Sequence, residues 1–296
     1  MLQLVFGVVM ISLSGVFVKL VDVDPTASAF YRMFFGGVVL AAITLARREP
    51  LWFGARFMWP AALAALWFVG DLWFWHRSIL YVGPGLATLL ANFQVFLLAV
   101  AGFLLYREKP GLRLAAAIPL AFAGLVLLVL PEWLSLGEDY RAGVVFGLVT
   151  AVCYAGYTLT LRFSRLGDSS ASNFANMAVL SLICAAILAP LTLIGGESLA
   201  IPSWKDFGWL LTYGVAGQVF GWVLISHSLP KLNASTVGLI LLLQPVSAFI
   251  LDIVLFDRQL MLIQFAGGAV ALVAIYLGSQ RKIESRRSKV ESAHPS

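Results

Sequence analysis

The sequence predicts an all-α polytopic membrane protein with ten transmembrane helices, arranged as two inverted five-helix repeats. Two features of the composition carry the first part of this prediction: only 12% of the 296 residues are charged, and 60% are hydrophobic. An average soluble domain has about 25% charged residues, and a soluble chain of this length could not cover so much apolar surface. The composition therefore excludes a soluble enzyme, a secreted disulfide scaffold and a disordered protein.

Ten apolar runs follow one another along the chain, each close to the length of about 20 residues that crosses a bilayer. They lie at 2–21, 27–46, 58–77, 84–105, 112–130, 142–162, 173–194, 206–227, 235–255 and 261–279. The loops between them are too short for a soluble domain. The polar stretch at 281–296 is a basic tail whose composition predicts disorder.

Basic residues are distributed unequally between the two sets of loops. Fourteen Lys and Arg residues lie at one side, five lie at the other, and Arg32 falls inside a span. The richer side consists of loops 47–57, 106–111, 163–172 and 228–234 together with the tail. Because basic loops stay in the cytoplasm, both termini are predicted to be cytoplasmic. The loops are too short to form a nucleic-acid groove, so we expect no nucleic-acid partner despite the net charge of +5.

The two halves of the chain resemble each other. The stretch DPTASAF at 24–30 matches DSSASNF at 168–174, and Ser78 and Gln94 align with Ser228 and Gln244. Each predicted half, 1–140 and 141–280, contains five spans. Because five is odd, the second half must cross the membrane in the opposite sense. Inverted repeats of this kind are typical of secondary transporters, with the substrate site near the midplane between them.

These features resemble the drug/metabolite transporter superfamily, EamA type. The resemblance rests on the ten spans, the repeat, the stretch Leu243–Val246 and the acidic–basic pairs Glu108–Lys109 and Asp257–Arg258. It covers the chain up to the basic tail. The family often has a proline in the fourth span, where this chain has Gln94–Val95. The resemblance implies a carrier of the inner (plasma) membrane, often an exporter of amino acids or other small metabolites.

Two opposite charges lie at matching depths in the second and third spans. Arg32 and Asp71 are each about five or six residues from the same membrane surface, a difference within one helical turn. Because a charge at the bilayer centre costs about 2.5–3.5 kcal/mol, we expect the two to form an ion pair. Such a pair either only ties the two spans together, or belongs to a site that binds a zwitterion and exchanges its partner for a substrate charge.

The candidate substrate-binding residues are the polar and aromatic side chains predicted near this depth. Gln94 and Gln244 are midplane amides at repeat-related positions, although interhelical hydrogen bonds are an alternative explanation. Asn92 lies about 200° around the helix from Gln94, so the two cannot both face one cavity squarely. The complete set is Arg32, Trp67, Asp71, Trp75, His76, Gln94, Tyr154, Tyr157, Gln218 and Gln244.

The sequence also lacks the motifs of several activities. It contains no phosphate-binding loop, no metal-ligand cluster and no nucleophile elbow. We therefore expect no catalytic residues, no metal and no cofactor. The prediction is a secondary transporter, an exporter of small organic metabolites such as amino acids by alternating access, with a proton as a candidate coupling ion near His76. An intramembrane enzyme acting on a lipid-linked substrate and a passive channel remain the alternatives.

Overall fold

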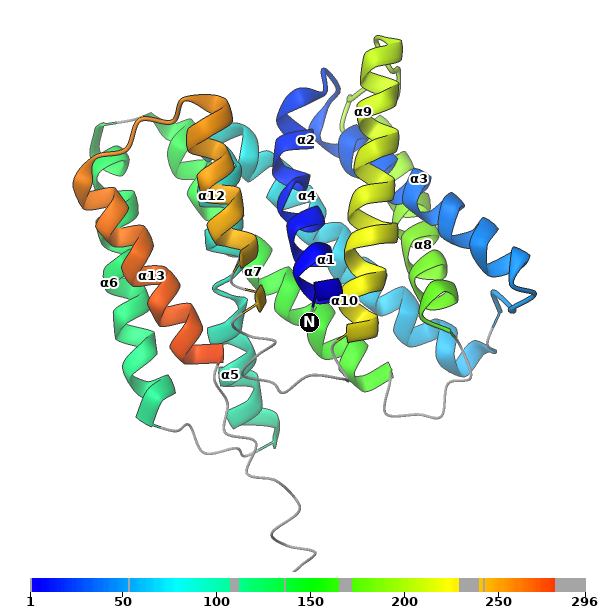
Figure 1. The fold of residues 1–296 in the computed structure, drawn as a ribbon, viewed down its shortest axis with the longest axis horizontal. Coiled ribbons are helices and arrows are strands. Elements are labelled where there is room, and N and C mark those ends of the chain that lie inside the picture. Colours follow the sequence, from blue (N-terminus) through cyan, green and yellow to red (C-terminus); the bar gives the residue numbers. More distant parts are fainter. Residues whose placement is uncertain are drawn as a thin grey trace, which may run out of the picture.

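The computed structural model describes residues 2–52, 54–106, 112–135, 137–164, 172–228, 240–241 and 243–279. Every regular element within these ranges is a helix (Figure 1). The basic tail, the pair Glu108–Lys109 and the start of the predicted span 235–255 lie outside the described residues.

The helices follow the predicted apolar runs, but several runs contain more than one helix. In chain order the described helices are α1 (Leu2–Ser12), α2 (Ser14–Leu20), α3 (Pro25–Ala46), α4 (Ala55–Ala91), α5 (Gln94–Tyr106), α6 (Leu112–Ser135), α7 (Glu138–Ser164), α8 (Asn173–Ile194), α9 (Trp204–Gly214), the π-helix η1 (Val215–Trp222), α10 (Val223–Ser228), α12 (Leu243–Phe256) and α13 (Leu262–Ser279).

Seven helical segments of the described chain are long and apolar enough to cross a membrane, which makes the chain a multi-pass membrane protein. One of them, Met58–Ala101, is 44 residues long and contains the predicted span 58–77 and most of the predicted span 84–105. Two shorter apolar helices, Leu243–Phe256 and Leu262–Leu277, lie near the end of the described chain.

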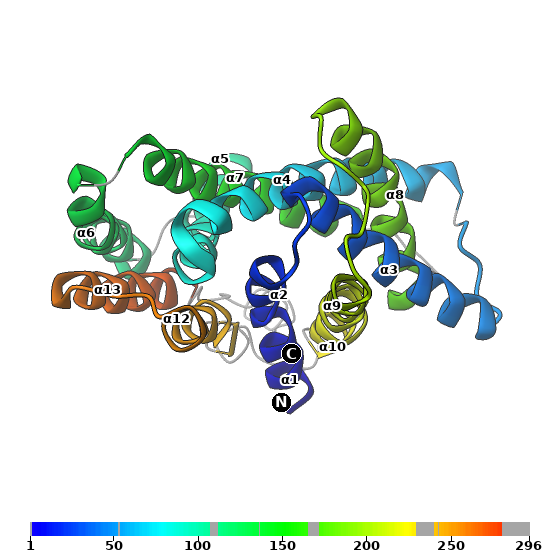
Figure 2. The ribbon, with the colours of Figure 1, turned by 90° about the horizontal axis from the view of Figure 1, so that it is seen from above.

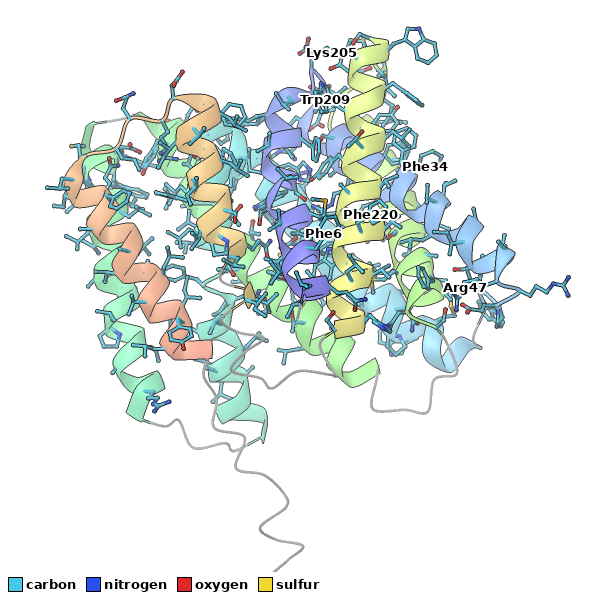
Figure 3. All side chains as sticks on the ribbon, in the orientation of Figure 1. Phe6, Phe34, Arg47, Lys205, Trp209 and Phe220 are labelled. Atoms are coloured by element: carbon cyan, nitrogen blue, oxygen red, sulfur yellow. The ribbon has the colours of Figure 1, made fainter. Side chains whose placement is uncertain are left out.

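Exposed apolar side chains such as Phe6, Phe34 and Phe220 cover the outside of the bundle, as expected of a surface that faces lipid (Figure 3). Arg47 and Lys205 lie at its opposite ends (Figure 3).

Helix α4 is broken at Gly83, which has a φ of 84° and a ψ of 158°. Glycine adopts a positive φ without a Cβ clash, and Pro84 disfavours a helical conformation at the residue before it. The break falls at the boundary predicted between the third and fourth spans. Beyond it, the Asp252 carboxylate accepts a hydrogen bond from the Gly85 amide at 3.2 Å and one from Arg258 at 3.1 Å. A carboxylate of α12 thus binds the start of the second part of α4.

The helices pack most extensively in three pairs, α3 with α8, α4 with α7, and α6 with α13. The first pair lies at one end of the molecule and the third at the other end, with α1 and α2 between them (Figure 2). Helix α1 packs against η1 and α12. Helix α1 begins and α13 ends toward the same end of the bundle (Figure 1).

Helices α3 and α8 end in the same way. Arg48 and Gly196 follow the two helices with positive φ values of 56° and 74°. The next amides, of Glu49 and Glu197, donate to carbonyls inside the preceding helices at 3.1 and 3.0 Å. A left-handed residue after a helix, followed by such a bond, satisfies carbonyls that the helix end would leave unpaired.

Each of these two glutamates also reaches the beginning of the other helix. The Glu197 carboxylate accepts hydrogen bonds from the amide and the hydroxyl of Thr26, in the first turn of α3, both at 2.8 Å. The Glu49 carboxylate accepts one from the hydroxyl of Ser172, the residue that caps α8. A negative charge at a helix N-terminus is favourable, so the antiparallel helices α3 and α8 cap each other.

Candidate functional site

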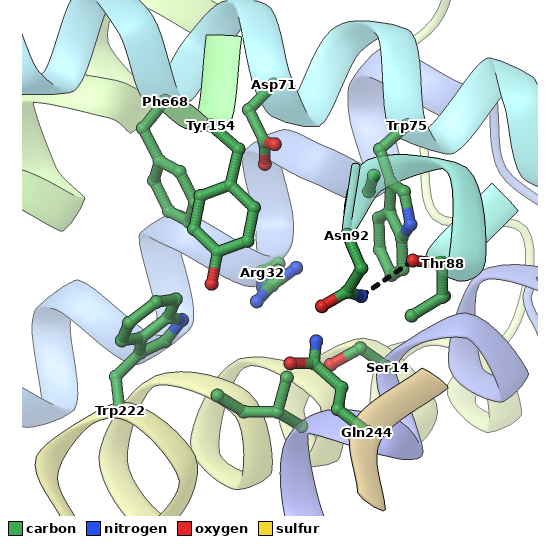
Figure 4. Close-up of a pocket in the computed structure, with 12 residues that line it drawn as sticks. Ser14, Arg32, Phe68, Asp71, Trp75, Thr88, Asn92, Tyr154, Trp222 and Gln244 are labelled. Carbon is green, nitrogen blue, oxygen red and sulfur yellow. Dashed lines mark hydrogen bonds between the residues drawn. The ribbon is translucent and has the colours of Figure 1, made fainter. Parts of the chain in front are cut away.

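A cavity lies where helices from both halves of the chain meet (Figure 4). Its volume is about 40 Å³, enough for a few water molecules. A solute as large as an amino acid therefore requires the surrounding helices to separate. The lining residues are Ile11, Ser14, Arg32, Phe68, Asp71, Trp75, Thr88, Ala91, Asn92, Tyr154, Trp222 and Gln244.

Arg32, on α3, places a positive charge in the cavity while only 4% of its surface is exposed. Its Nη1 donates a hydrogen bond to the Tyr213 hydroxyl at 3.1 Å. The guanidinium carbon lies 5.1 Å from the centre of the Tyr213 ring and 5.9 Å from that of Trp75. Aromatic faces attract cations at such distances. The Nε atom of Arg32 is buried without a partner.

Asp71, on α4, also lines the cavity, but the predicted ion pair with Arg32 is not formed. The ion pairs in the described part of the chain are Arg47–Glu49, Arg77–Glu197, Arg258–Glu132 and Arg258–Asp252. Matching depth correctly placed Arg32 and Asp71 in one cavity. It did not predict the partner of Arg32, because Tyr213 comes from α9 and holds the guanidinium instead.

Several other buried polar atoms around the cavity lack a hydrogen-bond partner. They are Ser14 Oγ, Thr88 Oγ1 and Trp222 Nε1, in addition to Arg32 Nε. A buried polar group without a partner costs about 1–3 kcal/mol, and such groups are rare in native structures. Their concentration around one cavity makes it the candidate site of the described chain.

Five of the ten predicted site residues line the cavity: Arg32, Asp71, Trp75, Tyr154 and Gln244. They come from α3, α4, α7 and α12, so the site combines groups from both halves.

Two of the predicted aromatic residues lie outside the cavity lining. Trp67 is 38% exposed and packs against Gly156 of α7, where a Cβ would approach its ring to 2.5 Å. Tyr157 stacks on Phe68, with 4.6 Å between ring centres. Phe68 lines the cavity in their place.

The remaining three predicted residues are not among the lining residues of the cavity. Gln94 accepts a hydrogen bond of 3.5 Å from the Thr158 hydroxyl. Asn92 lines the cavity instead. It lies in the interruption between α4, which ends at Ala91, and α5, which begins at Gln94. Gln218 donates to Ser181 at 3.2 Å. His76 lies behind Arg32, with its Nε2 3.1 Å from the Tyr213 hydroxyl.

The residues that sequence reasoning missed include Tyr213, Trp222, Ser14 and Thr88. Tyr213 lies in α9 just before η1, the π-helix in the eighth predicted span, and Trp222 is the last residue of η1. A π-helix changes the side-chain register and is frequent at functional sites. No helical periodicity in the sequence predicts it. One sequence signal for the close approach of this segment to α3 is Gly214, where a Cβ would come within 2.9 Å of the α3 backbone.

Comparisons with known proteins agree with this architecture. The EamA-like transporter family matches residues 1–130 and again residues 141–279. A WAT1-related protein of Arabidopsis thaliana, described as chloroplastic, is 26% identical over 86% of this chain, which spans 62% of that protein's length. An uncharacterized transporter of Archaeoglobus fulgidus is 24% identical over 93% of this chain and 94% of its own length.

A protein of known crystal structure has the same fold, with a TM-score of 0.65 at 19% identity, over 94% of this chain and 98% of its own. Since the EamA-like transporter family matches nearly the whole sequence and one relative is named as a transporter, the chain is a membrane transporter and not an enzyme. It belongs to the EamA-like transporter family.

Proposed function

We propose that this transporter exports neutral amino acids or similar zwitterionic metabolites, and that the cavity opens to the two sides of the membrane in turn. The observation that carries the proposal is the relation between Arg32 and Asp71. They line the same cavity with opposite charges, yet they form no ion pair with each other. One solute with a carboxylate and an ammonium group can therefore engage both.

The groups beside each charge suit the two ends of such a solute. Arg32 Nε, Trp222 Nε1 and the Ser14 hydroxyl are donors for a carboxylate. Asp71 is the acidic group of the cavity lining and suits an ammonium.

An aromatic surface lies next to the charges. The rings of Tyr154 and Phe68 lie 6.5 and 6.2 Å from that of Trp222, and all three line the cavity (Figure 4). They favour an apolar or aromatic side chain on the solute.

The proposed alternating access rests on two inverted five-helix repeats, at 1–140 and 141–280. The family matches each half separately, which supports the repeat. The contacts agree with it: α3 and α8 are the second predicted spans of the two halves, and α6 and α13 are the fifth. A cavity between related halves can open to either side when the halves exchange conformations.

The direction of transport, the coupling ion and the cellular location are further parts of the proposal. Basic loops at one side support cytoplasmic termini in an inner membrane. We propose a proton as the coupling ion. Asp71, which faces the cavity, is a better site for it than His76, which has no exposed surface and whose two ring nitrogens are both engaged.

Three related compounds test the solute class. Phenylalanine has both charges, phenethylamine lacks the carboxylate, and 3-phenylpropionate lacks the ammonium. We expect phenylalanine to raise the unfolding temperature of the purified protein and the other two to have little effect. Arg32→Gln and Asp71→Asn should each abolish the shift. Equal stabilisation by all three compounds would show that the two charges do not recognise a zwitterion.

Transport itself is measured with the protein in proteoliposomes. A carrier gives saturable phenylalanine flux and counterflow, in which unlabelled solute on one side drives uptake of labelled solute. Flux that neither saturates nor shows counterflow would indicate a channel.

A further inference from the structure

A chain of hydrogen bonds fixes Arg32 through groups that do not line the cavity. Arg32 Nη1 donates to the Tyr213 hydroxyl at 3.1 Å, and that hydroxyl lies 3.1 Å from His76 Nε2. His76 Nδ1 lies 2.7 Å from the carbonyl oxygen of Leu72, one turn earlier on α4. Tyr213 and His76 are both 0% exposed. The chain therefore joins α3, α9 and α4 behind the cavity.

The direction of each hydrogen bond follows from the last acceptor. The Leu72 carbonyl can only accept, so the hydrogen of the neutral His76 ring must be on Nδ1, which leaves Nε2 as an acceptor. The Tyr213 hydroxyl then donates to Nε2, and its oxygen accepts from Arg32. If Nε2 carried the hydrogen instead, the Tyr213 oxygen would face two donors, and its own hydrogen would have no acceptor in the chain.

Without this chain, Arg32 would be drawn toward Asp71. Opposite charges attract much more strongly in a buried site than in water, and a guanidinium binds a carboxylate well through two parallel hydrogen bonds. Both groups line one cavity of about 40 Å³, and the arginine side chain is long and flexible. An Arg32–Asp71 pair would occupy both charges.

We propose that Tyr213 and His76 are positioning residues, which hold Arg32 apart from Asp71 and keep both charges free for the two ends of one solute. Tyr213 holds the guanidinium, and His76 orients the Tyr213 hydroxyl. This inference rests on the proposed function, because it concerns how the zwitterion site stays open.

The first test contains no solute. Asp71→Asn is introduced into three backgrounds: wild type, Tyr213→Phe, and the matched control Tyr31→Phe. The Tyr31 hydroxyl donates to the Leu199 carbonyl, away from the cavity. In Tyr213→Phe the freed Arg32 pairs with Asp71, so Asp71→Asn should lower the unfolding temperature by about 2–4 °C more than in the other backgrounds. Equal shifts in all three backgrounds overturn the proposal.

A second pair of variants gives the same test if Tyr213→Phe does not fold. His76→Gln keeps an acceptor for the Tyr213 hydroxyl, whereas His76→Leu does not. The extra effect of Asp71→Asn should appear with leucine and be absent with glutamine. The same effect in both would show that the orientation of the hydroxyl is irrelevant.

The tautomer of His76 is a direct spectroscopic check. Nitrogen-15 NMR of the histidine ring should find the hydrogen on Nδ1 in the wild type, and Tyr213→Phe should shift the Nε2 resonance because its donor is lost. A hydrogen on Nε2 in the wild type overturns the proposed chain.

Binding of phenylalanine separates this inference from the proposed function. A hydrogen bond to a charged group contributes about 1.5–3 kcal/mol, so Tyr213→Phe should weaken phenylalanine binding about 10- to 100-fold, and Tyr31→Phe should leave it unchanged. If phenylalanine does not bind the wild type, the proposed solute class is wrong. The thermal cycle and the NMR measurement still decide the role of Tyr213.

Discussion

Two predicted site amides differ in what they contact. Gln244 lines the cavity, whereas Gln218 is 2% exposed and donates hydrogen bonds to Ser181 at 3.2 Å and to the Met33 sulfur at 3.1 Å. The first can meet a solute, and the second joins η1 to α8 and α3. Substituting each with alanine therefore has different consequences.

Gln244→Ala should weaken solute binding about 2- to 10-fold, the value of one neutral hydrogen bond, with normal yield and unfolding temperature. Gln218→Ala should instead destabilise the protein by about 1–3 kcal/mol because it leaves Ser181 without this donor, and solute affinity should not change. Flux assays and thermal unfolding measure the two effects. Loss of stability in Gln244→Ala together with loss of solute affinity in Gln218→Ala would contradict both assignments.

For single residues, the sequence predicted the depth in the membrane better than the direction in which a side chain points. Arg32 and Asp71 were predicted at one depth because distance along a helix fixes depth in the membrane, and both line the cavity. Gln94 was preferred over Asn92 on the repeat, whereas Asn92, where the helix is interrupted, is the one that lines the cavity. Tyr213 was missed because its partner Arg32 is 181 residues away.

Close backbone contact between α3 and η1 depends on glycine. A Cβ at Gly36 would lie 2.6 Å from the Gln218 Cβ and 2.8 Å from the Gly214 carbonyl oxygen. Gly36→Ala should therefore lower stability by about 1–3 kcal/mol, because overpacking forces the backbones apart. Gly208→Ala is the control, since nothing lies within 4 Å of a Cβ at that position. Thermal unfolding should separate the two variants, and equal stability would mean that α3 and η1 do not approach as described.

The bond between Glu49 and Ser172 predicts a dependence of stability on pH. The Ser172 hydroxyl and the nearby Arg47 hold the pKa of the Glu49 carboxyl below its usual value. Its contribution is present above the unfolded pKa of about 4.3 and is lost as the pH falls through the lower folded pKa. Glu49→Gln should thus lower the unfolding temperature at pH 6, and the difference from wild type should shrink below about pH 4. A constant difference across this range would contradict the assignment.

At the scale of elements, apolar runs predicted several helices closely. The predicted run 173–194 coincides with α8, Asn173–Ile194, and 27–46 ends with α3 at Ala46. Hydropathy did not predict the interruption between α4 and α5, nor the π-helix η1, because both lie inside runs that are apolar on average.

The whole chain has a predicted orientation that labelling can test. A single-cysteine variant at Ser292, in the basic tail, should react with a membrane-impermeant reagent only after the cells are permeabilised. Ala200→Cys, in the exposed loop between α8 and α9, should react in intact cells. Labelling of the Ser292 variant in intact cells would reverse the orientation.

For the molecule as a whole, the family and the membrane class followed from composition, spacing and loose motifs, and the family match covers both halves. Solute identity did not follow, because the groups that line the cavity come from seven different helical elements. Their convergence is a property of the packed structure that no local stretch of sequence contains.

The reciprocal caps of α3 and α8 have a consequence for biosynthesis. The chain leaves the ribosome from its N-terminus, and the carboxylate that accepts from Thr26 is made 171 residues later. The first turn of α3 therefore stays without this acceptor until most of the protein has been inserted. The partner of Glu49 likewise belongs to the second half. When either half is produced alone, the start of its own helix, α3 or α8, lacks the glutamate that the other half supplies. We therefore expect separately produced halves to be stable only when they are made together.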